Sequence, residues 1–224
     1  MARTTSNKKR TKLNVTTPVG VFAFPYIDRP CTKFAGKDNP DGEFKVDVVI
    51  DPDDPGLAPL EKKLQELASI RKKEIGLDES TKVALPIKPH MDSNKSETGK
   101  LVIRCRTNAC LRFDGEPPIR RKVTVLDSGA NVVAPAPAIG PGTEGRVLAI
   151  ATANYFEPDD TLFVKLAPDA VQIAKLIERG QFSKERYAVG WIDGDFDGAA
   201  TPVMVPGAES DEAPLPDTTS DRRF

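Results

Sequence analysis

Short runs of β-branched and aromatic residues alternate along the chain with polar turns, the pattern of a small barrel or sandwich of short strands. Glycine, proline and aspartate mark the connections, as in the stretch DRPCTKFAGKDNPDG between the first two runs. We predict strands at 19–27, 42–50, 100–113, 119–126, 145–156 and 161–166. The chain is therefore expected to be mainly β.

One helix interrupts this pattern at 58–75. Its apolar residues recur at helical spacing, with lysines, arginine and glutamate between them; they are Leu60, Leu64, Leu67 and Ile70. We expect this helix to pack across a sheet. The residues at 76–99 are expected to form a loop, and 169–180 fits both a helix and a final strand.

The strand at 100–113 has two different faces, because successive side chains of a strand point to opposite sides of the sheet. Its odd positions are mostly apolar and suit a core. Its even positions carry four basic side chains and no acidic one; they are Lys100, Arg104, Arg106 and Arg112. Like charges on neighbouring strands repel, so we predict that a polyanion covers this face. An ordinary solvated basic surface is the alternative.

Other basic and aromatic residues extend this prediction. Lys122 lies in the next predicted strand and Arg146 opens another. Phe34, Tyr155 and Phe156 could stack on bases, each for about 1–3 kcal/mol, or could fill the core instead. No recognition-helix or zinc-finger pattern is present, so base-specific reading is not expected.

The net charge of −1 conceals an asymmetry between the two ends of the chain. Residues 1–12 carry five basic side chains and no acid, whereas 191–224 carry eight acids and two arginines. Such segregation is typical of interaction tails. We expect a flexible basic arm at 1–16, one domain at 17–192 and a disordered acidic tail at 193–224.

Composition narrows the class of protein further. Hydrophobic residues make up 39% of the chain, enough for a core, and no apolar run is long enough to predict a membrane span. The three cysteines show no paired spacing, which is typical of reduced thiols.

Signatures of catalysis or metal binding are weak. The one histidine, His90, has no acid or cysteine at ligand spacing, and no phosphate loop or nucleophile elbow is present. The string DGDFDG at 193–198 begins like a calcium loop, but its twelfth position is Met204 instead of a glutamate. We therefore expect no enzyme activity, no cofactor and no metal.

Several motifs in order resemble a known family. They are PYIDRP and NPDGEFKVDVVI, then VLDSGANVV and AIGPGTEGRV, then ATANYF and LFVKLAPDAVQI, with a phenylalanine at position 224. Together they are similar to the single-stranded DNA-binding proteins of short-tailed bacteriophages of the T-seven type. The resemblance spans about residues 18–178 and the last residue.

The resemblance implies a five-stranded OB-fold barrel with one inserted helix. It implies a non-catalytic protein that coats single-stranded DNA in phage replication, recombination and repair, in the cytoplasm of the infected bacterium. It adds Arg29, Lys33 and Lys45 of the first motif to the DNA-binding candidates, beside Arg104, Arg106 and Tyr155. Homodimer formation is left open.

The resemblance also assigns a role to the acidic tail. In that family the tail competes with DNA, and its terminal ring docks on the phage DNA polymerase and helicase–primase, which Phe224 is expected to do here. Residues 207–224 carry five acids and two arginines, so weaker competition is expected than in the type protein. The alternative functions are a phage structural or assembly protein with a β-barrel body, and then a metal-dependent nuclease.

Overall fold

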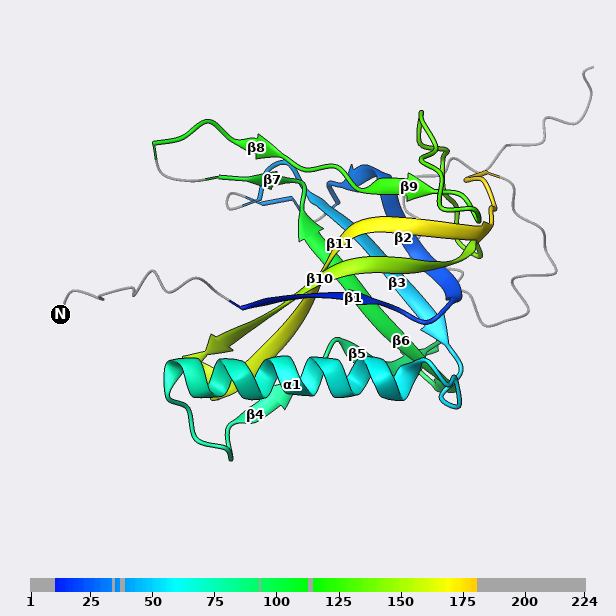
Figure 1. Ribbon diagram of the computed structural model, residues 1–224. Helices are drawn as coiled ribbons and strands as arrows, with labels where there is room; N and C mark the ends of the chain where they lie inside the picture. The colour runs from blue at the N-terminus through cyan, green and yellow to red at the C-terminus, as the bar shows by residue number, and fades with distance from the viewer. Residues whose placement is uncertain (1–10, 34, 37–38, 93, 113–114, 181–224) are drawn as a thin grey trace, which may run out of the picture. The chain divides into compact units, whose positions relative to one another are not determined.

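Five strands of the chain pair in a closed ring around the main core (Figure 1). The computed structural model describes residues 11–33, 35–36, 39–92, 94–112 and 115–180. The strands of the ring are β2 (Gly20–Cys31), β3 (Glu43–Ile50), β6 (Glu97–Asn108), β10 (Glu144–Phe156) and β11 (Thr161–Lys175).

All neighbouring pairs in the ring are antiparallel except one. β2 pairs with β3, β3 with β6, and β10 with β11 in antiparallel register. β6 and β11 are parallel and meet at Cys105 and Leu166. β10 returns to β2 where Gly145 faces Gly20, which closes the ring. A Cβ at Gly145 would collide with the carbonyl of Gln172 on β11, so the close approach of β10 and β11 at this point requires glycine.

Every second side chain along each strand points inward, and these side chains fill the interior of the ring. Phe22, Val46, Ile103, Val147 and Leu166 come from the five different strands and are completely or almost completely buried. They belong to one continuous cluster of apolar side chains. The predicted mainly-β fold, a five-stranded barrel with one inserted helix, is confirmed.

The helix α1 (Leu57–Ile75) follows β3 and packs against β1, β10 and β11 (Figure 1). Leu60, Leu64 and Leu67 are buried as predicted, but Ile70 is 48% exposed because the buried stripe continues through Ala68. The helix ends at Gly76, whose left-handed conformation (φ 70°) suits glycine. No helix in the described part of the chain has the length and apolar character needed to cross a membrane.

Shorter elements extend the ring. β1 pairs with β10, β4 and β9 pair with β11, β5 pairs with β6, and β7 and β8 pair with each other. Their bounds are β1 (Lys12–Thr16), β4 (Lys82–Ala84), β5 (Ile87–Met91), β7 (Cys110–Leu111), β8 (Ile119–Arg120), β9 (Thr124–Leu126) and the 3₁₀ turn η1 (Glu157–Asp159).

Three parts of the chain differ from the sequence prediction. Lys12–Thr16 pairs with β10, so these residues are not part of a flexible arm. The expected loop at 76–99 contains β4, β5 and the start of β6. The ambiguous segment at 169–180 is a strand as far as Lys175, because its alternate residues are buried against the core. The predicted tail at 193–224 lies outside the described residues.

Candidate nucleic-acid interface

The outer face of β2, β3 and β6 carries two rows of side chains, and most of these side chains are polar. Strand register places Ala23, Asp47 and Arg104 side by side in one row. Tyr26, Lys45 and Arg106 form the next row. The two rows are adjacent, because alternate residues of each strand point to the same side. We refer to these residues, with Glu43 at the end of β3, as the outer face.

A β-bulge places Tyr26 on the outer face. Strict alternation would put Tyr26 on the same side as Phe22, which is fully buried in the core. Between Ala23 and Tyr26, however, β2 has one more residue than the paired stretch of β3. Phe24 is the extra residue and has a positive φ of 48°. A bulge of this kind redirects the side chains that follow it.

Packing accounts for the unusual conformation of Phe24. Its ring packs against a small buried cluster of Ala23, Val49 and Val102, which is separate from the main core. Positive φ is strained for a large residue, so the burial of the ring on these three side chains offsets that cost. The bulge is therefore built into the face and its effect on Tyr26 is fixed.

Two cations lie near the ring of Tyr26. The Lys45 ammonium is 5.1 Å from the ring centroid and the Arg179 guanidinium carbon is 5.8 Å from it. Both distances suit a cation–π interaction. Arg179 is held by two hydrogen bonds to Asp28, of 2.8 and 3.2 Å, and by one of 3.2 Å to the carbonyl of Pro25. Tyr26 is thus a firmly positioned aromatic ring in a cationic environment.

Acidic side chains from a neighbouring strand interrupt the basic face predicted for 100–113, which the sequence of that strand does not indicate. Glu43 and Asp47 of β3 lie beside the arginines of β6. Nη1 of Arg106 is 3.6 Å from Oε1 of Glu43, and Nη2 is 3.9 Å from Oδ2 of Asp47. Opposite charges on neighbouring strands attract. The three cations, Lys45, Arg104 and Arg106, still outnumber the two carboxylates.

Asp47 is the most buried charged residue of the outer face. It is 8% exposed, and its Oδ1 atom has no hydrogen-bond partner among the residues that the structure describes. Burial raises the pKa of Asp47, while the nearby Arg106, Arg104 and Lys45 act in the opposite direction. The carboxylate is thus disfavoured by desolvation and favoured by its cationic neighbours.

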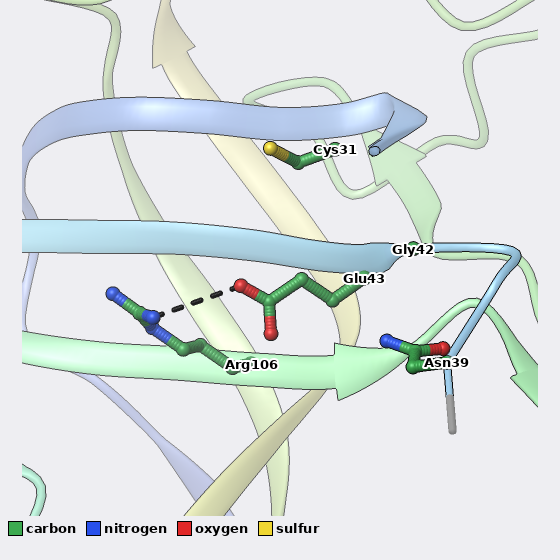
Figure 2. A pocket seen from close by; sticks show the side chains of 5 residues that line it. All are labelled: Cys31, Asn39, Gly42, Glu43 and Arg106. Carbon is green, nitrogen blue, oxygen red and sulfur yellow. Dashed lines mark ion pairs between the residues drawn. The ribbon is translucent and has the colours of Figure 1, made fainter. Parts of the chain in front are cut away.

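A shallow pocket of about 180 Å³ opens at one end of this face, lined by Cys31, Asn39, Gly42, Glu43 and Arg106. Figure 2 shows Glu43 and Arg106 reaching toward each other from neighbouring strands. Gly42 has a positive φ of 75°, and a Cβ there would collide with the carbonyl of Cys31. The pocket is small, and it is lined by both a guanidinium and a carboxylate.

More of the predicted cations lie near this end of the face. Arg29 is exposed near the end of β2, and Lys33 is exposed just after it. Arg112 bonds to Asp41, next to Gly42. Lys122 is exposed and follows Arg121, whose guanidinium bonds to Thr107 of β6.

Other predicted site residues lie elsewhere. Lys100 is four residues before Arg104 on β6 and pairs with Asp51 at 3.4 Å. Arg146 of β10 donates a hydrogen bond of 2.8 Å to Gln172. Tyr155 bonds to Asp160 at the β10–β11 turn. These positions are not beside the two polar rows of the outer face.

The aromatic residues predicted from the sequence to stack on bases lie in different environments. Phe156 is 49% exposed and its ring makes an edge contact with Phe163, 6.4 Å between centroids. Tyr155 packs partly against the main core, and its hydrogen bond to Asp160 raises the pKa of the phenol. Phe34 and Phe224 lie outside the described residues. Tyr26 was missed, because the alternation rule cannot anticipate a bulge.

Metal chemistry has no visible basis within the described ranges, where no three His, Cys, Asp or Glu side chains gather as metal ligands. The calcium-like string at 193–198 lies outside those ranges. Cys31, Cys105 and Cys110 are free thiols, all buried, and burial raises the pKa of the Cys105 thiol. His90 is buried against Thr98, and burial lowers its pKa.

The closed ring β2–β3–β6–β11–β10, in which only β6 and β11 are parallel, defines an OB-fold barrel. In this fold the second and third strands and two adjacent loops form the usual oligonucleotide-binding surface. Here those two strands are β3 and β6.

Among solved structures, the chain is similar to gp2.5, a single-stranded DNA-binding protein encoded by bacteriophage T7. The TM-score is 0.59 at 18% identity, over 85% of this chain and 100% of that one. The single-stranded DNA-binding protein from bacteriophage Enc34 matches as a C-terminal truncation, with a TM-score of 0.48 and 15% identity over 74% of this chain and 87% of that one. Its complex with ssDNA gives a TM-score of 0.47 and 16% identity over 74% and 88%.

No protein-family model and no curated protein matches the chain. The comparison with gp2.5 confirms, at the level of the fold, the resemblance that the sequence motifs indicate.

Proposed function

We propose that this chain binds single-stranded DNA with little sequence preference on the outer face, and that it is not an enzyme. The observation that carries this proposal is the position of Lys45, Arg104 and Arg106. They lie on the second and third strands of an OB-fold barrel, the surface that such barrels use for oligonucleotides. Tyr26 adds an aromatic ring to the same surface.

The cations supply phosphate contacts. Arg104 and Arg106 are exposed, and Lys45 is partly exposed between Tyr26 and Arg106. In the absence of DNA, Glu43 and Asp47 partly neutralise Arg106. A phosphate is a stronger partner than a carboxylate at 3.6–3.9 Å, because a guanidinium binds it through two parallel charge-assisted hydrogen bonds.

Tyr26 supplies a stacking surface. Every base has a π-face, so stacking on tyrosine tolerates any sequence. In this proposal Lys45 moves from the ring to a phosphate and a base takes its place over Tyr26. The hydrogen bonds from Arg179 to Asp28 and Pro25 keep the second cation in position.

The path of the DNA extends from Arg104 and Arg106 toward the end of β6. Arg29, Lys33, Arg112 and Lys122 are exposed near that end and are proposed as further phosphate contacts. Lys100, Arg146, Tyr155 and Phe156 lie away from this path, and remain predictions from the sequence and the resemblance alone.

The wider biological role is proposed from the resemblance in sequence and fold. We place the protein in phage DNA replication, recombination and repair, in the cytoplasm of the infected host. The acidic tail, ending in Phe224, would contact the phage polymerase and helicase–primase. These partners are inferred from the family pattern, and the described residues carry no argument for them.

The decisive experiment is a fluorescence-anisotropy titration of a labelled oligothymidine over a range of salt concentrations. Each neutralised phosphate contributes about −0.7 to the slope of log K against log salt for a single strand. Three cations give a slope of about −2, and the four flanking cations bring it to about −5. Absence of binding at low salt, or a slope near zero, would reject the proposal in favour of an assembly protein. Degradation of the oligonucleotide in magnesium would instead indicate a nuclease.

A further inference from the structure

Asp47 is an unexpected residue for a surface that binds a polyanion. It lies between Ala23 and Arg104 in the strand register, in the middle of the outer face. It is also next to the apolar cluster that Phe24 forms with Val49. A buried carboxylate on such a face repels phosphate and is itself costly to desolvate.

The side chains around Asp47 come from three strands. Its own strand β3 contributes Lys45 and Glu43, and β6 contributes Arg104, Arg106 and the buried thiol of Cys105. β2 contributes the uncharged Ala23 and the Tyr26 phenol. The cations hold Asp47 in its charged form. In return Asp47 holds Arg106, whose Nη2 is 3.9 Å from Oδ2.

We infer that Asp47 is the counter-charge of Arg106 at the outer face of the free protein, and that it takes up a proton when DNA phosphate replaces it as the partner of that arginine. This inference rests on the proposed function. It assigns the carboxylate a role that depends on its protonation, which distinguishes it from a purely structural ion pair.

The direction of the coupling follows from electrostatics. A phosphate near Arg104 and Arg106 adds negative charge close to Asp47 and draws the guanidinium groups toward itself. Both changes disfavour the carboxylate, so the pKa of Asp47 is higher with DNA than without it. Oδ1 has no hydrogen-bond partner among the described residues, so no hydrogen bond to this atom offsets the change. Binding therefore takes up a proton, and by linkage the affinity rises as pH falls from the pKa of Asp47 in the DNA-bound state toward its lower pKa in the free protein.

Glu43 provides the matched comparison. It also pairs with Arg106, at 3.6 Å, but its side chain is 27% exposed whereas that of Asp47 is 12% exposed. Water screens the more exposed carboxylate, so Glu43→Gln removes a partner of Arg106 without removing a buried carboxylate. The two residues thus share a partner and differ in burial.

The experiment measures oligothymidine affinity between about pH 5.5 and 7.5 for the wild type, Asp47→Asn and Glu43→Gln. The wild type and Glu43→Gln should bind several-fold tighter at the lower pH. Asp47→Asn, which imitates the protonated form, should lose most of this dependence and bind at pH 7.5 at least as tightly as the wild type. His90 is present in all three proteins, so any contribution from its titration cancels.

Several outcomes would overturn the inference. Equal pH dependence in the wild type and Asp47→Asn would do so, as would an Asp47→Asn protein that melts normally but binds weakly at every pH. Should Asp47→Asn fail to fold, calorimetric titrations of the wild type near pH 6 in two buffers of different ionisation enthalpy replace it. These titrations should show net uptake of protons when DNA binds. If they show no uptake, the inference is rejected. Failure of the wild type to bind at any pH would reject the proposed function itself.

Discussion

The ammonium group of Lys45 lies 5.1 Å from the centroid of the Tyr26 ring, across the pairing of β2 and β3. This relationship exists only because the bulge at Phe24 brings Tyr26 to the outer side of the barrel. A rigid aromatic ring beside a movable cation can accept a base on the ring and a phosphate on the cation. In the proposed function the same pair therefore serves both parts of a nucleotide.

Replacing Tyr26 by alanine should weaken oligothymidine binding, because a stacked base contributes about 1–3 kcal/mol. That corresponds to a loss of about 5- to 150-fold in affinity. Tyr26→Phe keeps the ring and should bind nearly as well as the wild type. Anisotropy titrations at one fixed salt concentration measure both variants.

An abasic strand of the same length tests whether the lost contact is to a base. It keeps every phosphate and removes the stacking partners, so the wild type and Tyr26→Ala should bind it equally. If Tyr26→Ala were as defective on the abasic strand as on oligothymidine, the ring would serve the shape of the face and not stacking.

The alternation rule predicted much of β6 correctly. Ile103 and Cys105 face the core and Arg104 and Arg106 face outward, as their parity indicates. The same rule applied to 42–50 would have placed Glu43 and Asp47 on one face. That they lie beside the arginines depends on the pairing of β3 with β6, which is a long-range contact and is not encoded in either strand alone.

Two further differences between the sequence prediction and the structure also have identifiable causes. The bulge at Phe24 depends on an apolar cluster built from three strands, so no single segment reveals it. β4 and β5 are short, and β5 contains Pro89, which weakens a strand pattern. The helix was predicted well because its apolar spacing is regular over five turns, which is the strongest kind of local signal.

The double substitution Arg104→Ala and Arg106→Ala should make the salt dependence shallower by about 1.4, since two phosphate contacts are lost. Lys62→Ala and Lys63→Ala remove the same charge from the exposed side of α1 and should leave the slope unchanged. Arg104→Ala alone keeps the contacts of Arg106 with the carboxylates, and should change the slope by about 0.7. If the double substitutions in β6 and in α1 gave the same slope of log K against log salt, Arg104 and Arg106 would not be part of the DNA site.

Gly42→Ala should destabilise the protein more than Gly99→Ala does. Both glycines have a positive φ, of 75° and 76°, which costs an alanine about 1 kcal/mol. A Cβ at Gly42 also meets the carbonyl of Cys31, whereas a Cβ at Gly99 has no atom within 4 Å among the described residues. We expect losses of about 2–4 and about 1 kcal/mol in the free energy of unfolding. Equal losses in urea titrations would show that the loop yields without strain.

Arg179→Ala should lower the free energy of unfolding by about 1.5–3 kcal/mol, because it removes charge-assisted hydrogen bonds to a largely buried Asp28. Lys175→Ala breaks an exposed pair with Glu144 and should cost less than about 1 kcal/mol. A double-mutant cycle of Asp28→Ala with Arg179→Ala isolates the coupling between the two side chains. A coupling near zero would mean that Arg179 contributes through its contacts with Tyr26 and the backbone carbonyls instead of through Asp28.

Removal of 207–224 should tighten oligothymidine binding at low salt, because the tail carries five acids against two arginines and competes with phosphate for the same cations. Competition should disappear at high salt, where screening removes it. Phe224→Ala keeps every acid, and should leave DNA affinity unchanged while it abolishes capture of the phage polymerase. A truncated protein that still captures the polymerase would show that Phe224 is not the contact.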